Sequence, residues 1–381
     1  MKFEILKTDQ KARCTKITTA HGIIETPIFM PVGTQGSVKA ISPRGLNEIG
    51  AQIILGNTYH LYLRPGMEVL NNFTGLHKFM SWDKPILTDS GGFQIFSLND
   101  LRKISETGVE FSSHLDGTKH FFTPEKVVEI QRVIGSDIMM VLDECAPFGA
   151  SFDYVKKSNE LTLRWASESM EAFKKTNSLY GFEQNIFGIV QGSVFKEIRK
   201  ISAEELIKMD FDGFAIGGLA VGENAETMYD ITTFTEEFLP QNKPRYLMGV
   251  GTPENLLESI ERGIDMFDCV MPTRNARNSL LFTSGGKKNL RNAKYKFDKN
   301  PIDSECDCYA CKNFSVGYLR HLFMAKEILA FELATTHNLN FYLKLMSEVR
   351  VNIHKNNYSN WKKEQIFKWS MNEDKDSSNE Q

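Results

Sequence analysis

Residues 137–144 read DIMMVLDE, a run of apolar residues that ends in two acidic ones. A short apolar run of this kind is typical of a strand that is buried on both faces, as the strands of parallel sheets are. Similar runs recur along the chain: PIFMPV (27–32), AQIILGN (51–57), KPILTDS (84–90), NIFGIVQG (185–192), GFAIGGLA (213–220), RYLMGVG (245–251) and DMFDCVMP (265–272). Most of them lead into a loop and then into amphipathic sequence, so the chain is predicted to consist of repeated βα units.

Eight βα units are the number that closes a (β/α)8 barrel, and the length of the chain suits one. The sequence therefore predicts an α/β fold of the TIM-barrel type, with an open doubly wound sheet as the alternative. Helix starts are expected at Ser42-Pro43, Thr123-Pro124 and Thr252-Pro253, where a hydroxyl residue precedes a proline that suits the first helical turn.

Two stretches depart from the repeat. Residues 102–122 alternate like a β-hairpin, with Asp116-Gly117 as its turn. A second insertion, near residues 272–340, follows the last strand and carries three clustered cysteines. We expect both insertions to belong to a single barrel domain over residues 1–368, followed by a polar, disordered tail over residues 369–381.

Composition bounds the class of protein. The chain has a formal net charge of −3 and no apolar run long enough to span a membrane. The N-terminal residues lack the apolar core of a secretory signal, so a cytoplasmic location is expected. Residues 271–320, by contrast, hold ten Lys and Arg against four Asp and Glu. This basic segment indicates either a polyanionic partner such as nucleic acid or simply a solvated charged face.

Several predicted strands end in a polar residue. Asp89, Asp143, Gln191 and Asp268 each follow an apolar run, and in a barrel the C-terminal ends of the strands meet at one active-site face. Any one of them is an ordinary helix cap or turn residue, but together they predict a shared pocket. Carboxylates there suit chemistry at an anomeric carbon, with one as nucleophile and a second as acid and base.

The cysteine cluster CDCYAC supplies three soft metal ligands, Cys306, Cys308 and Cys311. Zinc takes a fourth ligand, for which His337 and His321 are the candidates, and a closed Cys3His site is structural. A disulfide and an iron–sulfur cluster are the alternatives. The first suits a reducing cytoplasm poorly, and the second more often uses four cysteines.

Seven motifs together resemble those of the bacterial tRNA-guanine transglycosylases, the queuine tRNA-ribosyltransferase family. They are LTDSGGFQIFSL (87–98), VLDEC (141–145), IVQGS (189–193), GGLAVGE (217–223), YLMGVGTPE (246–254), FDCVMPTRNARN (267–278) and CDCYACKNFSVGYLRHL (306–322). The resemblance implies a pentosyltransferase of queuosine biosynthesis, with a (β/α)8 barrel and a zinc-binding insertion after the last strand. It would exchange the wobble guanine of tRNAs with a GUN anticodon (Asp, Asn, His and Tyr types). The motif LAVGE resembles the bacterial subtype, which takes 7-aminomethyl-7-deazaguanine (preQ1).

The resemblance also implies roles for individual residues. Asp268 matches the nucleophile, which forms a covalent bond with the ribose, and Asp89 matches the general acid and base. Glu223 would support the peptide whose carbonyl, at Leu219, meets the aminomethyl group. The implied base-binding residues are Asp89, Ser90, Gly91, Gly92, Phe93, Asp143, Gln191, Gly218, Leu219 and Met248. The implied RNA-binding residues are Gly249, Val250, Gly251, Thr252, Pro253, Glu254, Asn255, Thr273, Arg274, Asn275, Ala276 and Arg277.

The same resemblance implies one structural Zn2+ per subunit, bound by Cys306, Cys308, Cys311 and His337, and a homodimer that binds tRNA, preQ1 and guanine. Three other functions stay open on the sequence: a non-catalytic RNA-binding paralogue, a barrel hydrolase of small nucleosides, and a purely structural zinc protein. The first is expected to lack part of the acid set, and the second does not need a basic segment. The third leaves the strand-end acids unexplained.

Overall fold

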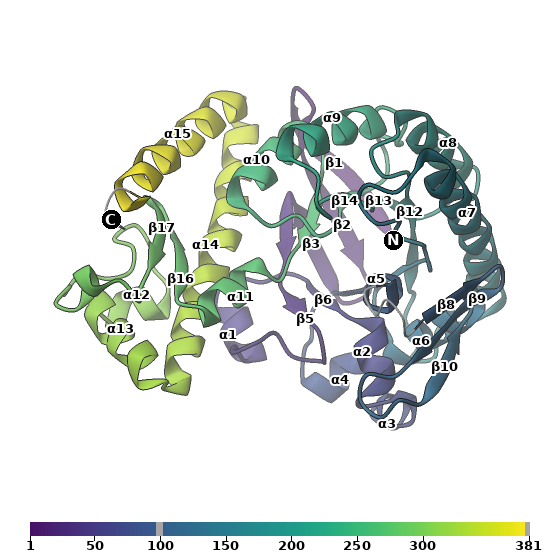
Figure 1. Ribbon diagram of the computed structural model, residues 1–381, viewed down its shortest axis with the longest axis horizontal. Helices are drawn as coiled ribbons and strands as arrows, with labels where there is room; N and C mark the ends of the chain where they lie inside the picture. The colour runs from purple at the N-terminus through teal and green to yellow at the C-terminus, as the bar shows by residue number, and fades with distance from the viewer. Residues whose placement is uncertain (97–101, 378–381) are drawn as a thin grey trace.

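The computed structural model describes residues 1–96 and 102–377. Its centre is a sheet of short parallel strands (Figure 1). In sheet order they are β4 (Ile28–Met30), β15 (Met266–Asp268), β14 (Arg245–Leu247), β13 (Gly213–Ile216), β12 (Asn185–Val190), β11 (Ile138–Met140), β7 (Ile86–Thr88), β6 (Ile54–Gly56) and β5 (Val32–Gly33). Only Pro31 separates β4 from β5, so they are two halves of one strand and the sheet closes on itself. The predicted (β/α)8 barrel is confirmed, and each apolar run supplies one strand.

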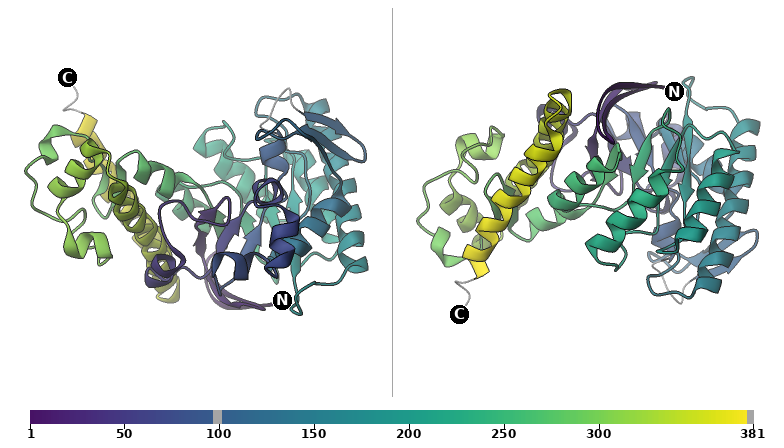
Figure 2. Two further views of the ribbon diagram at one scale, coloured as in Figure 1. Left: turned by 90° about the horizontal axis from the view of Figure 1, so that it is seen from below. Right: turned by 90° about the horizontal axis from the view of Figure 1, so that it is seen from above.

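The helices between β5 and β15 mostly cover the outside of the barrel, with α5 at the end of β7 as the exception (Figures 1 and 2). They are α1 (Pro43–Glu48), α2 (Thr58–Leu63), α3 (Met67–Asn72), α4 (Leu76–Met80), α5 (Gly92–Phe96), α6 (Pro124–Ile134), α7 (Phe152–Lys175), α8 (Lys196–Ile207), α9 (Ala225–Glu236) and α10 (Pro253–Glu261). The hydroxyls of Ser42, Thr123 and Thr252 cap α1, α6 and α10 by accepting a backbone N–H two residues into each helix. The three predicted helix starts are thereby confirmed.

The insertion between β7 and α6 is a small antiparallel sheet of β8 (Arg102–Ser105), β9 (Gly108–Ser112) and β10 (Lys119–Phe122). The predicted hairpin is its β9–β10 half, with Asp116-Gly117 in the connecting turn. The sequence prediction missed the third strand, β8, which pairs with β9 through a second turn at Glu106-Thr107. Residues 97–101 lie outside the described part of the chain.

The second insertion follows β15. It comprises α11 (Met271–Arg277), β16 (Leu280–Thr283), β17 (Gly286–Asn289), the 3-10 helix η2 (Ala293–Tyr295), α12 (Tyr309–Asn313) and α13 (Val316–Ala325). The long helix α14 (Ile328–His354) packs against α11 and β16 of the insertion and also against β1, β2 and β4. It therefore fixes the insertion to the barrel, beside which the insertion lies in both views of Figure 2.

The C-terminal helix α15 (Tyr358–Ser377) corrects one prediction. A disordered tail was expected from residue 369, but Trp369 is buried and its ring lies 6.2 Å from that of Phe341. This indole anchors the helix against α14, so the helix continues to Ser377. Residues 378–381 lie outside the described part of the chain. Among the helices that the structure describes, none combines the length and apolar character that crossing a bilayer requires.

The N-terminal end of the barrel is covered by the antiparallel sheet β1 (Lys2–Asp9), β2 (Ala12–Thr19) and β3 (Gly22–Thr26). Aspartates placed one residue before a strand tie this end together. Asp137 accepts the N–H of Ile86, the first residue of β7, and Asp265 that of Arg245, the first residue of β14, at 2.9 and 2.8 Å. Asp212 accepts the N–H of the second residue of β12, Ile186, at 3.0 Å. Each carboxylate thus bridges two neighbouring strands where the sheet hydrogen bonds begin.

Asp137 also joins the barrel to two covering elements. It is fully buried and accepts hydrogen bonds from the ring nitrogens of His21 (2.9 Å), between β2 and β3, and His77 (3.2 Å), on α4. Burial alone would raise the pKa of Asp137, but the bonds from both histidines outweigh it and hold the pKa below its usual range.

Replacing Asp137 by Asn should cost roughly 3 kcal/mol of folding free energy at neutral pH, because the buried donors lose a charged acceptor. Since the pKa of Asp137 is lowered in the folded chain, its contribution is present above about pH 4, near the pKa of an unfolded aspartate, and is lost as the pH falls further. Denaturant unfolding of both proteins between roughly pH 3 and pH 7 measures this. A free-energy difference that stays constant toward the acid end would contradict it.

Candidate active site and metal centre

Asp89 follows β7 directly, and its carboxylate lies within a ring of donors. Oδ1 accepts the backbone N–H groups of Thr58 (2.9 Å) and Gly91 (3.1 Å), and Oδ2 accepts the side-chain amides of Asn57 (2.5 Å) and Gln94 (3.1 Å). Burial raises the pKa of Asp89 to about 7, although the two backbone hydrogen bonds act in the opposite direction. Asp89 can therefore hold or release a proton near neutral pH.

Asp268 is the last residue of β15. Its Oδ1 accepts the hydroxyl of Tyr246 (2.5 Å) and the N–H of Gly249 (2.9 Å). Burial raises the pKa of Asp268, and these two hydrogen bonds offset part of the rise. Its charge in turn helps to raise the pKa of Asp89, so the two carboxylates are close enough to interact. Within the described part of the chain no donor contacts Oδ2, which is left as the available oxygen.

Asp143 and Gln191 form a second, deeper pair. Both side chains are almost fully buried. The Gln191 amide donates to Oδ2 of Asp143 at 2.7 Å, and the Ser90 hydroxyl donates to Oδ1 at 3.2 Å. Burial raises the pKa of Asp143 to about 6 against these two hydrogen bonds. The pair offers carboxylate oxygens as acceptors and an amide as donor, a set that can read the edge of a purine.

The loop after β13 passes close to this pair. Gly218 has φ of +65°, and a Cβ on it would lie 2.4 Å from Oε1 of Gln191, so only glycine fits there. Further along, the carboxylate of Glu223 accepts the N–H groups of Ala220 (2.5 Å) and Val221 (3.2 Å). These bonds fix the turn that follows Leu219.

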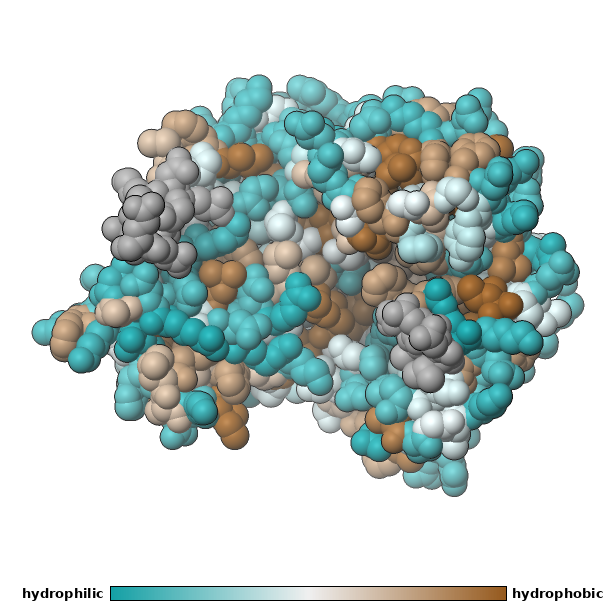
Figure 3. All heavy atoms as spheres, in the orientation of Figure 1, coloured by the Kyte–Doolittle hydropathy of each residue, from teal (hydrophilic) through white to brown (hydrophobic). Residues whose placement is uncertain are grey.

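The face of the molecule seen in Figure 3 is hollowed at its centre, between the insertion after β15 and the small sheet β8–β10. The helices α5 and α11, which follow two of the strand ends, lie on either side of the same central region in the ribbon view of Figure 1. Phe93, on α5, is 58% exposed, whereas Met248 is half-buried at the end of β14. The strand-end residues singled out in the sequence are thus brought together, with these two apolar side chains nearby.

The residues that contact the site but were not singled out from the sequence include Asn57, Tyr246 and Arg199, beside Thr58 and Gln94, which donate to Asp89. Asn57 ends the run AQIILGN, so the strand-end pattern that picked out the aspartates also contains it. Tyr246 lies inside an apolar run and resembles a core residue, and it is indeed fully buried. Arg199 lies on a helix, and its partners are backbone carbonyls, for which no sequence signal exists.

The stretches implied to bind RNA lie beside the site. Residues 249–255 run from Gly249, which donates to Asp268, to the first turn of α10. Residues 273–277 lie on α11, where Arg274 is exposed and Arg277 donates to the carbonyl of Thr273 at 2.9 Å. Burial lowers the pKa of Arg277, and the charge of Arg274 adds to the effect. Among the described residues neither arginine has an acidic partner, so both charges are available to an anion.

The cysteine cluster forms one group with His337, in which all but half-buried Cys306 are buried, and exposed His321 lies outside it. Nδ1 of His337 lies 3.3 Å from Sγ of Cys311 and 3.8 Å from Sγ of Cys308. Ligands of a tetrahedral ion are separated by about 3.5 Å. Nε2 of His337 lies 2.7 Å from the carbonyl oxygen of Phe282. That contact makes Nε2 the N–H donor and leaves the lone pair of Nδ1 for a metal, so the group could hold a metal ion.

A second group of potential ligands, His21, His77 and Asp137, is explained without a metal. The two imidazole rings stack with centroids 3.7 Å apart and planes 16° apart. Nearly parallel rings direct their nitrogens side by side instead of toward a single ion. Both rings instead contact the carboxylate of Asp137, as described above, so hydrogen bonding accounts for the group.

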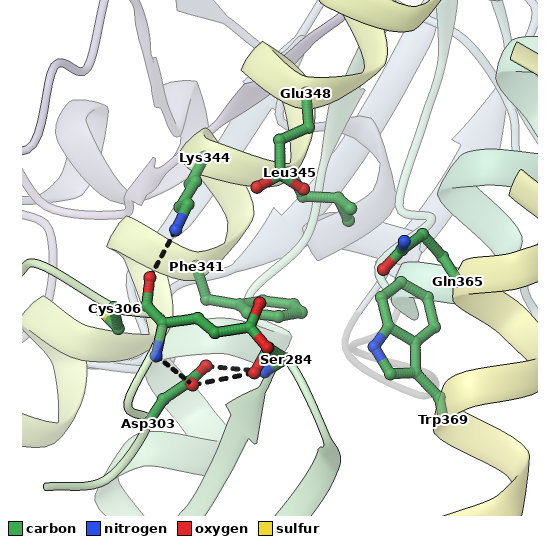
Figure 4. A pocket seen from close by; sticks show the side chains of 10 residues that line it. Ser284, Asp303, Cys306, Phe341, Lys344, Leu345, Glu348, Gln365 and Trp369 are labelled. Carbon is green, nitrogen blue, oxygen red and sulfur yellow. Dashed lines mark hydrogen bonds between the residues drawn. The ribbon is translucent and has the colours of Figure 1, made fainter. Parts of the chain in front are cut away.

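A small cavity of about 40 Å³ lies at the outer side of the metal group, between α14 and α15. Its lining residues include Asp303, Cys306, Lys344 and Trp369 (Figure 4). The Lys344 amine donates to the carbonyl of Glu305 there. None of the strand-end residues lines this cavity, which has room for water but not for a nucleobase.

The fold and these side chains define a barrel enzyme with buried acids at its strand ends and a separate Cys3His metal group. The family model of queuine tRNA-ribosyltransferase matches residues 8–371. Curated relatives named queuine tRNA-ribosyltransferase include that of Caldanaerobacter subterraneus subsp. tengcongensis, 58% identical over 98% of both chains. Another is that of Aquifex aeolicus, 54% identical over 96% of this chain and 98% of its own. The chain belongs to the queuine tRNA-ribosyltransferase family and is a pentosyltransferase.

The electrostatic interaction between Asp89 and Asp268 yields a testable prediction. Replacing Asp268 by Asn should lower the pKa of Asp89 from about 7, because the negative charge of Asp268 is one cause of its elevation. Infrared difference spectroscopy across the titration of the carboxylate measures this. The control is Asp137→Asn, at the opposite end of the barrel, which should leave the titration in place. An unchanged titration in the Asp268 variant would show that the two carboxylates do not interact.

The metal group yields another testable prediction. Cys308→Ser should reduce the bound metal from about one ion per chain to almost none and expose α12 and α13 to hydrogen exchange, because a bound ion would link the cysteine segment to His337 on α14. Metal analysis and exchange mass spectrometry measure both. Cys14→Ser, which removes a buried cysteine outside the group, should change neither. Full metal content in the Cys308 variant would exclude that thiol as a ligand.

Proposed function

We propose that this protein exchanges the wobble guanine of tRNAs with a GUN anticodon for preQ1, by double displacement at the ribose. The observation that carries the proposal is the pair Asp89 and Asp268. One has a pKa of about 7, and the other has one oxygen held by two donors and the other oxygen available. Family membership supports the tRNA-guanine transglycosylase reaction within queuosine biosynthesis.

In the first step Oδ2 of Asp268 attacks C1′ of the wobble nucleotide while the bond from C1′ to N9 breaks. The electron pair of that bond passes to guanine, and protonated Asp89 supplies the proton that the departing base needs. In the second step Asp89 takes the proton from N9 of the incoming base. N9 then attacks C1′, and the ester bond to Asp268 breaks. Two displacements at one carbon retain the β configuration.

The buried pair supplies base recognition. Asp143 would accept hydrogen bonds from the N1–H and amino group of guanine or preQ1, and Gln191 and the N–H of Gly218 would donate to O6. The carbonyl of Leu219, in the turn fixed by Glu223, would accept from the aminomethyl group of preQ1. Phe93 and Met248 would stack on the two faces of the ring. Ser90, Gly91 and Gly92 would form the wall of the pocket beside it.

The surroundings support an RNA substrate. A wobble base can reach buried Asp143 only after it leaves the loop stack, as in other enzymes that modify bases. Arg274 and Arg277, without acidic partners among the described residues, would hold phosphates of the anticodon loop. The metal group would bind Zn2+, since three thiolates and an imidazole suit that ion and four protein ligands leave no open position. We further propose a cytoplasmic homodimer, on the resemblance to the family.

The test is incorporation of labelled guanine into an unmodified tRNA with a GUN anticodon. Wild type should exchange the base, and Asp268→Asn should lose at least about 1,000-fold in rate, because an amide cannot form the ester intermediate. Its affinity for the tRNA, measured by a binding titration at fixed salt, should stay within about twofold.

Two results would count against this function. Absence of exchange by folded, metal-loaded wild type would favour the non-catalytic paralogue and direct the search to a missing partner chain. Release of guanine without any incoming base would favour a hydrolase. If guanine leaves the tRNA only when an incoming base is present, the result supports the transferase and excludes the hydrolase.

A further inference from the structure

Arg199 is a fully buried arginine whose partners are all backbone carbonyls. Nε donates to the carbonyl of Ser193 (2.8 Å), Nη1 to those of Val190 (2.9 Å) and Gly217 (2.7 Å), and Nη2 to that of Gly218 (3.3 Å). Val190 is the last residue of β12 and Ser193 lies in the loop after it, whereas Gly217 and Gly218 directly follow β13. The guanidinium therefore lies directly beneath the two segments that carry Gln191 and Gly218.

Placing a positive charge at this position carries a large desolvation free energy. Burial lowers the pKa of Arg199 to about 10, although the charge of Glu223 acts in the opposite direction. Among the described residues no carboxylate lies within ion-pair distance of the guanidinium. It also lies in the first turn of α8, where the helix dipole disfavours a cation. Neutral side chains could donate hydrogen bonds to the same carbonyls with a smaller desolvation penalty than a guanidinium cation has. A residue that breaks local rules in this way next to a pocket points to function.

The peptide between Gly217 and Gly218 shows what the charge can do. In a planar trans peptide the N–H points away from the C=O. Since the Gly217 carbonyl points at Arg199, the Gly218 N–H points the opposite way, out of the loop and away from the guanidinium. A hydrogen bond to the carbonyl from a cation also polarises the peptide and strengthens its N–H as a donor.

We propose that Arg199 is a positioning residue for the base exchange, which holds the Gly218 N–H toward the purine and stabilises the negative charge on the leaving base. The inference rests on the proposed function. As the bond from C1′ to N9 breaks, its electron pair enters the purine ring and increases the charge at O6. A fixed donor and a buried cation on that side favour the transition state over the ground state.

Arg132 provides a matched comparison. It is also buried, its pKa is also lowered to about 10 by burial, and it too donates to carbonyls, those of Phe173 and Thr176. Those carbonyls lie at the C-terminus of α7, where the helix dipole favours a cation. A structural role therefore explains Arg132, whereas no such helix end accounts for Arg199.

The experiment compares Arg199→Gln, Arg199→Lys and Arg132→Gln as full-length, metal-loaded protein. Arg199→Gln should lose about 100-fold or more in kcat for guanine exchange, the range for removal of an oxyanion donor, with tRNA affinity within about twofold. Arg199→Lys keeps the charge and should recover roughly tenfold of that loss. Arg132→Gln should lower the melting temperature at least as much as Arg199→Gln does and leave kcat within about threefold.

A second measurement separates charge stabilisation from mere folding. An anticodon stem-loop with 8-azaguanine at the wobble position carries a better leaving group, because the extra ring nitrogen stabilises the departing anion. The defect of Arg199→Gln should shrink with this substrate. An equal defect with both bases, no recovery by lysine, or an unchanged kcat in Arg199→Gln would each overturn the proposal. Inactive wild type would overturn the proposed function instead.

Discussion

The burial of three strand-end carboxylates is the constraint on which the active-site face depends. Asp143 is buried and Asp89 and Asp268 are half-buried. Within the described residues the hydrogen bonds that they accept come from neutral donors, which stabilise a charge less than a cation does. All three pKa values are raised as a result. Asp89 and Asp143, with pKa values of about 7 and about 6, can exchange protons near neutral pH, which an exposed aspartate cannot do.

At the opposite end of the barrel the buried charged groups are paired with groups of opposite charge or with histidines. There Asp265 is paired with Arg13, Arg245 with Glu236, and Asp137 with two histidines. The aspartates also bridge neighbouring strands through backbone N–H groups. Paired charges at one end and unpaired acids at the other divide the barrel into a stabilising face and a reactive face. The proton equilibria of the site are therefore set on a scaffold whose closure does not rely on them.

The sequence predicted the barrel because every strand is a short apolar run between polar residues, and it predicted the acids because each ends such a run. The same pattern does not identify Tyr246, because its ring belongs to the core although its hydroxyl donates to Asp268. Nor could it reach Arg199, since every residue has a carbonyl and only the folded loops bring four of them together. Strand β8 and the helical extent of α15 were missed for a similar reason. Both depend on tertiary partners, Val109 on β9 and the ring of Phe341.

A pocket made only of acids would oppose the reaction that we propose for it. A purine that leaves C1′ gains negative charge while it lies against Asp143, whose ionised form repels that charge. Its raised pKa reduces the conflict but does not remove it, because about 6 still lies below neutral pH. Arg199 is the only arginine among the described residues that donates to the carbonyls of both Gly217 and Gly218. A cation placed behind a polarised peptide can stabilise the departing base without forming an ion pair that would quench the acids. In this proposal the guanidinium acts on the departing base through the peptide. The arginine is therefore buried beneath the loops instead of lining the pocket.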